Sequence, residues 1–335
     1  MTPQELQQRL GRFPRLSLAR TPTPLTYLSR LSAAMGRPIF IKRDDELGPG
    51  LGGNKTRKLA YLLGEALNRG SRKVVTFGGL QSNHARLTAA AANKAGLEAH
   101  LFYFEKRPSR LLGNLLINDL LGATMHFVPL GGGSDGSMTL ETTIRLVRLL
   151  ARLWVGPNYF IPVGGHTWLG CLGYVEAAVE IQQQMAGLGL AGGRLITAAG
   201  TGGTLAGLWA GFTLLDSPIR PLGIDVGKLW KGFPASIAGL AAEISRQLGE
   251  PGTFLPGEVP LVENRFVGDR YGVPSRAGDE ALRFLARTEG ILLDPVYTAK
   301  AFAGLLDLAG GGELGREEPV VFLHTGGIPA LFAFT

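Results

Sequence analysis

Short apolar segments alternate along most of the chain with longer segments in which apolar residues recur every three or four positions. The short segments predict strands and the longer ones predict helices. Strands are expected at residues 38–43, 73–77, 98–104, 124–128, 159–163, 195–199, 221–226 and 319–323. Helices are expected from Lys55 to just before Gly70, and at residues 83–95, 109–121, 138–153, 168–185, 204–215, 233–248, 279–289 and 297–308. Residues 21–25 are expected to be extended, residues 131–133 to begin a loop, and residues 251–274 to be irregular.

The expected strands are apolar throughout and do not alternate with polar residues. Strands of this kind are typical of a parallel sheet that is covered by helices on both faces. The pattern therefore predicts an α/β fold. In such sheets, ligands bind at the carboxyl ends of the strands, where loops lead into helices. The polar residues of those loops are the first candidates for chemistry.

Residues 52–59, Gly-Gly-Asn-Lys-Thr-Arg-Lys-Leu, begin one of these helices. Lys55 lies one turn before Leu59 and so on the apolar face, while Arg57 and Lys58 are expected to fall to the side. Burial and the positive end of the helix dipole both disfavour a charged lysine there. A neutral lysine amine can form a Schiff base with a carbonyl. The simpler interpretation, a lysine that extends to solvent at a helix end, is favoured by this stretch alone.

A glycine-rich turn, Gly200-Thr201-Gly202-Gly203-Thr204, follows the strand expected at residues 195–199. Backbone N–H groups in such a turn and at the start of the next helix can bind a phosphate, and the hydroxyls of Thr201 and Thr204 can add donors. The turn is neither a P-loop nor a Gly-x-Gly-x-x-Gly motif. A tight turn without a ligand is the commoner explanation of an isolated glycine-rich loop.

Other strand-to-helix turns also contain polar side chains. Ser82, Asn83 and His84 lie at a helix start, where a capping residue alone would explain one of them but not all three. They predict a carboxylate site that also contacts a ring oxygen of a cofactor. Tyr271, Tyr297 and the His324-Thr325-Gly326-Gly327 turn each have a simple structural explanation. Together with the lysine and the phosphate turn, however, they are what a pyridoxal 5′-phosphate (PLP) site requires.

The charge and the cysteine content limit the possible partners. The 335 residues have a formal net charge of +7, but the basic residues are scattered singly, so nucleic-acid binding is not expected and an anionic cofactor or substrate is. Cys171 is the only cysteine, which excludes a disulfide within the chain and a cysteine-based metal site. No apolar segment predicts a secretion signal or a membrane span, and a cytoplasmic protein is expected.

Six short motifs are distinctive as whole strings: residues 41–45 (IKRDD), 52–59 (GGNKTRKL), 81–86 (QSNHAR), 172–176 (LGYVE), 271–274 (YGVP) and 293–301 (LDPVYTAKA). With these motifs the chain resembles, over nearly its whole length, the PLP enzymes related to D-cysteine desulfhydrase and 1-aminocyclopropane-1-carboxylate (ACC) deaminase, within the tryptophan synthase β-like group. The resemblance implies a two-domain, doubly wound α/β fold with mostly parallel sheets. It places a large PLP-binding domain at residues 1–54 and 161–335 and a smaller inserted α/β domain at residues 55–160. A homodimer is also implied.

The resemblance also assigns roles to residues. Lys55 matches the lysine that binds the cofactor covalently, and Gly200 to Thr204 match the phosphate loop, with Lys58 as an additional partner. Ser82, Asn83 and His84 match the residues around the substrate carboxylate, and Asn83 also matches the partner of the cofactor's ring hydroxyl. Tyr271 and Tyr297 match the tyrosines on the substrate side. Lys55, Ser82, Tyr271 and Tyr297 are the expected catalytic residues.

Three positions resemble the desulfhydrase branch more than the ACC deaminases. ACC deaminases have a glutamate that faces the pyridine nitrogen where this chain has Thr298, and a leucine where it has Thr325. They also tend to have glutamine at the position of His84. A hydroxyl does not keep the pyridine nitrogen protonated as a carboxylate does, so the ring is a weaker electron sink. That suits elimination of a good leaving group more than opening of a cyclopropane.

Two loops depart from the family pattern. Members that resemble the desulfhydrase have Ser-Asn where this chain has His166-Thr167, followed by Trp168. Because that loop is expected to border the substrate, His166 is a candidate substrate-binding residue. Residues 227–230 (GKLW) are also unusual, and a basic or aromatic lining there would select a larger or more anionic substrate.

The hypothesis that follows is β-elimination from a β-substituted amino acid, with D-cysteine as substrate and pyruvate, ammonia and sulfide as products. The alternatives on the same cofactor are an L-cysteate sulfo-lyase, a D-serine dehydratase-like enzyme and, less well supported, an ACC deaminase. A protein of another class, which binds a ligand on this fold without turning it over, is disfavoured by the intact set of Lys55, the Ser82–His84 turn and the phosphate loop.

Overall fold

The computed structural model of this chain describes residues 1–129, 139–227, 232–315 and 317–334. The loop expected at residues 131–133, the first residue of the helix expected at 138–153, and residues 228–230 of the unusual GKLW loop lie outside the described residues.

The larger of two sheets has six strands in the order β1-β2-β10-β7-β8-β9. All neighbouring strands are parallel except β1, which runs antiparallel to β2 at one edge. The strands are β1 (Leu25–Tyr27), β2 (Ile39–Lys42), β7 (Gly193–Ala199), β8 (Ile219–Asp225), β9 (Leu261–Val262) and β10 (Val320–Leu323).

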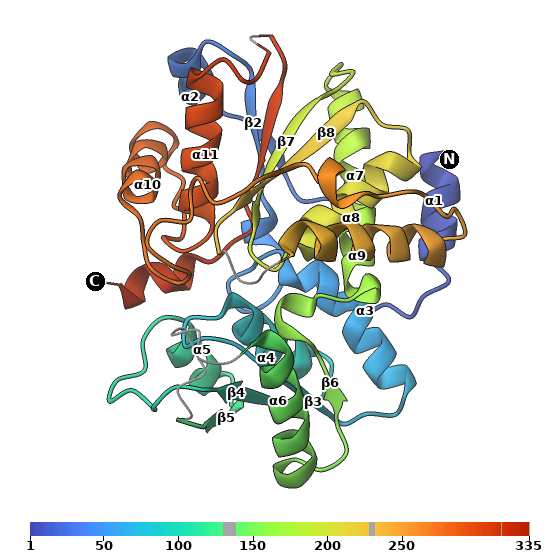
Figure 1. The fold of residues 1–335 in the computed structure, drawn as a ribbon, viewed down its shortest axis with the longest axis vertical. Coiled ribbons are helices and arrows are strands. Elements are labelled where there is room, and N and C mark those ends of the chain that lie inside the picture. The colour runs from blue at the N-terminus through green and yellow to red at the C-terminus, as the bar shows by residue number, and fades with distance from the viewer. Residues whose placement is uncertain (130–138, 228–231, 316, 335) are drawn as a thin grey trace.

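Helices cover both faces of this large sheet (Figure 1). On one face, α2 (Ser29–Met35), α10 (Arg276–Glu289) and α11 (Thr298–Gly310) share one apolar core with the sheet. On the other face, α1 (Pro3–Leu10), α7 (Trp168–Gly187), α8 (Gly203–Leu214) and α9 (Phe233–Gln247) share another. The large sheet is therefore doubly wound, as expected.

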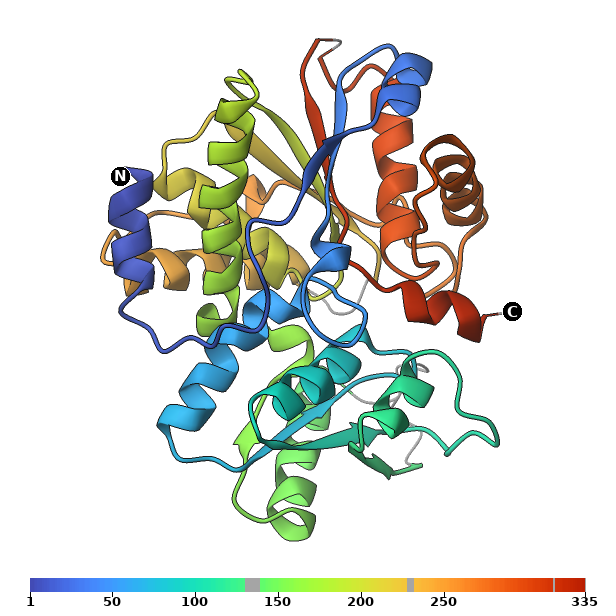
Figure 2. The same ribbon diagram turned by 180° about the vertical axis from the view of Figure 1, so that it is seen from behind.

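The smaller sheet has four parallel strands in the order β5-β4-β3-β6. These are β3 (Lys73–Phe77), β4 (Glu98–Tyr103), β5 (Thr124–Phe127) and β6 (Tyr159–Phe160). The small sheet also has helices on both faces: α6 (Leu140–Trp154) packs on one, and α4 (Asn83–Lys94) and α5 (Asn114–Leu120) lie on the other. Viewed from behind, α3 (Lys55–Asn68) lies where the two layered units meet (Figure 2), and it packs against both α7 and α4.

The predicted α/β fold with mostly parallel sheets is confirmed, and all eight predicted strands are present. Two elements are shorter than predicted by three residues or more. The helix expected from residue 109 begins at Asn114, because Gly113 is left-handed with φ 55° and the Asn114 N–H bonds to Gln81 Oε1 at 2.9 Å. The strand expected to reach residue 163 ends at Phe160, since Pro162 has no N–H to continue the ladder.

Several short elements were not predicted, although one of them had a clear signal. Helix α1 begins with a capping box in which the Thr2 hydroxyl accepts from the Glu5 N–H and the Glu5 carboxylate accepts from the Thr2 N–H. Strand β1, helix α2 and strand β9 were also missed, because they are only three, seven and two residues long. Among the helices of the described part, none combines the length and the apolar character needed to span a bilayer.

Helix α3 differs from the expected amphipathic helix. Arg57 and Lys58, expected to fall to the side, are buried with 4% and 1% of their surface exposed, whereas Lys55 is partly exposed. Arg57 and Lys58 are buried because α3 is surrounded by α7, α4 and the loops of the large sheet, which leave no solvated face over its first turns. Periodicity in a sequence cannot distinguish polar residues that face water from polar residues that face buried partners.

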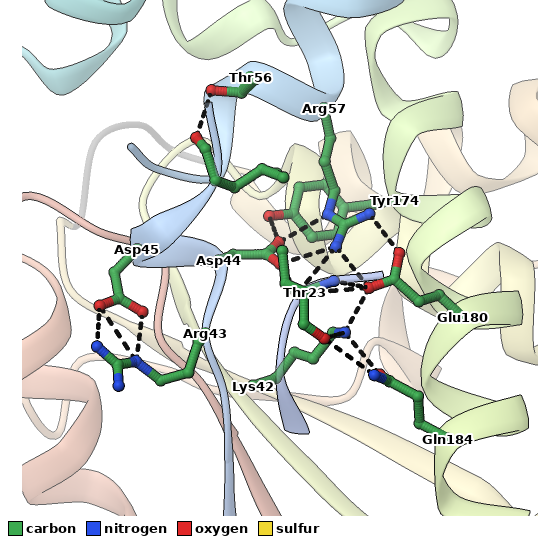
Figure 3. A network of polar contacts seen from close by, with 11 residues as sticks. Thr23, Lys42, Arg43, Asp44, Asp45, Thr56, Arg57, Tyr174, Glu180 and Gln184 are labelled. Carbon is green, nitrogen blue, oxygen red and sulfur yellow. Dashed lines mark hydrogen bonds and ion pairs between the residues drawn. The ribbon is translucent and has the colours of Figure 1, made fainter. Parts of the chain in front are cut away.

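A buried network of two cations and two carboxylates holds the start of α3 on the large sheet (Figure 3). Arg57 donates to both oxygens of Asp44, each at 2.8 Å, and to both oxygens of Glu180 on α7, at 2.9 and 3.0 Å. Lys42, at the end of β2, donates to Glu180 and to the Thr23 carbonyl. The charges balance, so the network connects β2, α7 and α3 without leaving an unpaired ion.

The remaining lone pairs of the network are also satisfied. Asp44 accepts from the Tyr174 hydroxyl at 2.8 Å and from the Thr23 hydroxyl at 2.8 Å. Burial acts to raise the pKa of Asp44, but the charge and hydrogen bonds of Arg57 outweigh it and hold the pKa below its usual value of 3.8. This carboxylate therefore stabilises the fold above that pH, and the contribution is lost as the pH falls through the lowered pKa.

We expect Gly173→Ala on α7 to destabilise the protein. A methyl group there would lie 2.4 Å from the Arg57 carbonyl oxygen, so α7 and α3 would have to separate. Overpacking of this kind typically costs about 1–3 kcal/mol in the free energy of unfolding, measurable by urea denaturation. Gly187→Ala on the same helix is the matched control, because nothing lies within 4 Å of the added methyl. Equal effects of the two changes would show that this close approach is not a constraint.

We also expect Asp44→Asn to lower the free energy of unfolding by about 3–5 kcal/mol, since it leaves Arg57 and Lys42 with one carboxylate between them in a buried site. Glu280→Gln removes a carboxylate from the exposed pair with Arg276 and should leave the stability nearly unchanged. A loss for Asp44→Asn no larger than for Glu280→Gln would mean that the network does not stabilise the fold.

Candidate active site

The loops after β2, β7 and β10 converge on the start of α3. These strands are parallel neighbours, so their carboxyl ends lie at the same edge of the large sheet. The Asn54 N–H donates to the Thr325 carbonyl at 3.1 Å, and a Cβ built on Gly326 would lie 2.8 Å from the Gly53 Cα. Both Gly53 and Gly326 have positive φ, at 138° and 89°. Only residues without a side chain permit this close approach of two backbones.

Lys55 is the first residue of α3, and its side chain is partly exposed among buried neighbours. Its Nζ donates to Asn54 Oδ1 at 3.1 Å. Burial, and next the charge of Lys58, lower the pKa of Lys55 to about 7, against the opposing influence of Asp294. At pH 7 a substantial fraction of the Lys55 amines is therefore neutral, compared with fewer than about one in a thousand for an ordinary lysine. A neutral amine of this kind is a nucleophile and a base.

Asn54 connects this amine to the glycine-rich turn. Its Oδ1 accepts from Lys55 and its Nδ2 donates to Thr204 Oγ1 at 3.1 Å. Asn54 was expected only in the turn that begins the helix, and its side chain makes no capping hydrogen bond there. No signal in the sequence distinguishes this bridging role from the common role of asparagine in turns.

The turn from Gly200 to Thr204 joins β7 to α8 as predicted. Gly202 is the N-cap of α8 in the left-handed conformation, with φ 78°, so the first N–H groups of α8 are not capped by a side chain. A Cβ on Gly203 would lie 2.7 Å from Lys58 Nζ, which shows how closely the lysine approaches the turn. Lys58 itself is anchored by the Gly164 carbonyl at 3.2 Å, and Thr201 packs against Gly164.

Ser82, Asn83 and His84 lie at the start of α4, but their side chains point to different partners. Ser82 is the N-cap and accepts from the Ala85 N–H at 3.2 Å, while its hydroxyl retains a proton to donate. Asn83 is partly exposed, with Oδ1 accepting from Asn114 Nδ2 at 2.9 Å. A Cβ on Gly327 would lie 2.8 Å from Asn83 Nδ2, which places this amide beside the loop after β10.

His84 is turned toward the small sheet. Its Nε2 lies 2.9 Å from the hydroxyl of Thr76 on β3, and that hydroxyl bonds to the Ile161 carbonyl at 2.8 Å. Burial, and then the charges of Lys55 and Lys58, lower the pKa of His84 well below its usual value. The imidazole is thus neutral near pH 7 and does not offer a positive charge to a carboxylate.

The two predicted tyrosines lie together. Tyr271 and Tyr297 share a short hydroxyl–hydroxyl hydrogen bond, and their rings pack edge to face with centroids 6.0 Å apart. A Cβ on Gly200 would lie 3.3 Å from the Tyr297 ring, so the pair borders the first residue of the glycine-rich turn. Burial raises the pKa of both phenols, which keeps them protonated near neutral pH.

Thr298 and Thr325 are both buried. Thr298 Oγ1 lies 2.7 Å from Asp294 Oδ2, and the Asp294 carboxylate also accepts from the backbone N–H groups of residues 296–298. Asp294 thus organises the loop before α11. Thr325 contributes its carbonyl to Asn54, as described above.

Arg86 is the last residue of the motif at residues 81–86 and was not predicted as a site residue. It lies on α4, is fully buried, and donates to the carbonyls of Gly50 and Gly52 and to Asn114 Oδ1. Burial lowers its pKa to about 10. Arg86 therefore fastens the loop before Lys55 to the small sheet's helices. With Lys55 and Lys58 it places three basic side chains in this region, and the charge of Asp294 acts on both Lys55 and Arg86.

Similarity to known proteins identifies the family of this chain. The family model described as pyridoxal-phosphate dependent enzyme matches residues 16–326. The chain is 40% identical over 334 residues to proteins named D-cysteine desulfhydrase from Salmonella choleraesuis (strain SC-B67) and Salmonella schwarzengrund (strain CVM19633), with 97% of each chain covered. It is also similar to a crystal structure titled as an ACC deaminase homologue, with a TM-score of 0.88, 38% identity, and 98% and 97% of the two chains covered. The chain belongs to the family of pyridoxal-phosphate dependent enzymes.

Proposed function

We propose that this protein is a PLP-dependent lyase that eliminates the β-substituent of an amino acid, with D-cysteine as its substrate and pyruvate, ammonia and sulfide as products. The central observation is the Lys55 amine, which has a pKa near 7 and is linked through Asn54 to the glycine-rich turn. The 40% identity to D-cysteine desulfhydrases over nearly the whole chain supports this choice of substrate.

The residues present fit PLP. Its phosphate is a dianion, and the uncapped start of α8 with the buried Lys58 beside it supplies N–H donors and a positive charge. Its aldehyde needs a neutral amine, which Lys55 supplies. When bound, PLP serves as the acceptor of the electron pair left when the Cα proton is removed.

The chain's own residues then have separate tasks. The Ser82 hydroxyl and the N-terminus of α4, with Asn83, hold the substrate carboxylate. Lys55, once freed from the cofactor, takes the Cα proton. As the Cβ–S bond breaks, the protonated Tyr271–Tyr297 pair donates a proton to the leaving sulfur. Hydrolysis of the remaining three-carbon unit by one water yields pyruvate and ammonia.

Thr298 supports β-elimination over ring opening. At the position where ACC deaminases have a carboxylate, this chain has a hydroxyl that is already bonded to Asp294. We propose that Thr298, bonded to Asp294 in this way, does not keep the pyridine nitrogen of the cofactor protonated. We therefore propose that ACC is a poor substrate.

We further propose that residues 1–54 and 161–335 form the large PLP-binding domain and residues 55–160 the smaller one, which agrees with the strand content of the two sheets. We also propose a cytoplasmic homodimer that binds neither nucleic acid nor membranes. Exposed leucines on α5, Leu116 and Leu120, offer an apolar surface for such a dimer. The single buried cysteine is consistent with a reducing compartment.

The proposal predicts that the PLP-loaded protein releases pyruvate from D-cysteine faster than from L-cysteate, D-serine or ACC under the same conditions. Lys55→Ala should reduce that release by about 1000-fold or more, because it removes both the covalent anchor and the base. Lys106→Ala, at an exposed lysine, is the control and should not change it. Faster pyruvate release from L-cysteate or D-serine than from D-cysteine would support a lyase whose leaving group is not sulfide. No pyruvate from any of these three amino acids would refute the lyase assignment.

The pKa of Lys55 predicts a pH profile for cofactor capture. The rate at which protein stripped of PLP regains the absorbance of the bound cofactor should rise as the pH increases through about 7 and level off above it, since only the neutral amine reacts. The lowered pKa places the transition below that of free N-α-acetyllysine, whose rate should continue to rise to about pH 10.4. A protein profile that follows the free amine would mean that Lys55 is an ordinary charged lysine.

A further inference from the structure

His166, which was expected on the substrate side, lies beside the first residue of α8 in the structure. A Cβ built on Gly203 would lie 3.3 Å from His166 Nδ1 and 2.7 Å from Lys58 Nζ. Both nitrogens thus face the same residue, the first of α8. The Tyr271–Tyr297 pair borders the other end of the glycine-rich turn, at Gly200. Lysine and histidine therefore converge on the part of the turn where N–H groups are available for an anion.

The second nitrogen of the ring is held by another element. His166 Nε2 lies 3.1 Å from the hydroxyl of Ser236 on α9. If this hydroxyl donates to Nε2, the ring proton resides on Nδ1, the nitrogen that faces Gly203. Burial, and next the charge of Lys58, lower the pKa of His166 to about 4, so the ring remains neutral and keeps one donor and one acceptor.

We propose that His166 is a cofactor-binding residue, whose Nδ1–H donates to the phosphate of PLP beside Lys58 while Ser236 fixes the tautomer. This inference rests on the proposed function only in placing the phosphate at the turn from Gly200 to Thr204. This assignment changes the role expected for the loop at His166-Thr167-Trp168, where the chain departs from the family pattern. His166 then affects the affinity for the cofactor and not the choice of amino acid substrate. Lys58 supplies the charge at this site, and His166 supplies a directed donor without a second positive charge.

The test compares two ligands that differ only in the phosphate. Affinities of the stripped protein for PLP and for pyridoxal are measured by absorbance titration, and their ratio isolates the phosphate contribution from bonding to Lys55. His166→Leu should lower the PLP-to-pyridoxal affinity ratio by about tenfold, because a hydrogen bond to a charged group is lost. His166→Gln, which retains a donor of similar reach, should restore most of the ratio, and Ser236→Ala should lower it by less than His166→Leu.

His126→Leu is the matched control, since His126 lies on β5 of the small sheet and contacts His100 and Phe102 instead. It should leave the ratio unchanged. An unchanged ratio in both His166→Leu and Ser236→Ala would overturn the proposal, and Ser236→Ala alone decides if the leucine variant does not fold. A rise in KM for the amino acid at saturating PLP with no change in the ratio would also overturn it, by returning His166 to the substrate side. A wild-type protein that binds PLP but forms no pyruvate would refute the proposed reaction and leave this inference standing.

Discussion

The ion pairs of Arg57 with Asp44 and Glu180 are the interaction on which the rest of the site depends. Arg57 lies two positions after Lys55 on α3, and its partners come from the segment after β2 and from α7. Buried ions are costly to remove from water, so such a network is stable only when each charge is paired and each lone pair is satisfied. Asp44 meets that condition with partners in Arg57, Tyr174 and Thr23. The direction of these bonds fixes how α3 is rotated, and with it where the Lys55 amine points.

Burial also lowers the pKa of the Lys55 amine at the start of the same helix. Lys55 and Lys58 are one turn apart, and after burial the charge of Lys58 is the strongest influence that lowers the pKa of Lys55. Lys58 remains beside the glycine-rich turn, where an anion would balance it, and Lys55 can give up its proton. The proposed function accounts for these buried basic groups, because they favour the binding of an anionic ligand. The overall charge of +7 is distributed too widely to reveal this.

The site is built where the two sheets meet, and small contacts keep the two parts in register. Arg86 on α4 binds the carbonyls of the loop before Lys55, and Gly113 before α5 approaches the Pro329 carbonyl. Asn54 joins that loop to the turn after β7. Each of these contacts needs either a glycine or a side chain with several hydrogen-bonding positions. This requirement explains why the motifs at residues 52–59 and 81–86 are distinctive as whole strings.

The sequence by itself determined the alternation of strands and helices, the parallel sheet and the glycine-rich turn, because these follow from local periodicity and from the chemistry of single residue types. The role expected of Lys55 came from the family resemblance, since its own stretch favours a lysine that extends to solvent. Only the tertiary structure decided that Arg57 and Lys58 are buried, that His84 faces Thr76, and that His166 faces Gly203 beside Lys58. The physical reason is that the hydrogen-bonding groups of a polar side chain can be satisfied either by water or by a buried partner, and the local sequence does not say which. The residues that supply the buried partners here, such as Asp44 and Glu180 for Arg57, are far apart in the chain and meet only when the sheets are assembled.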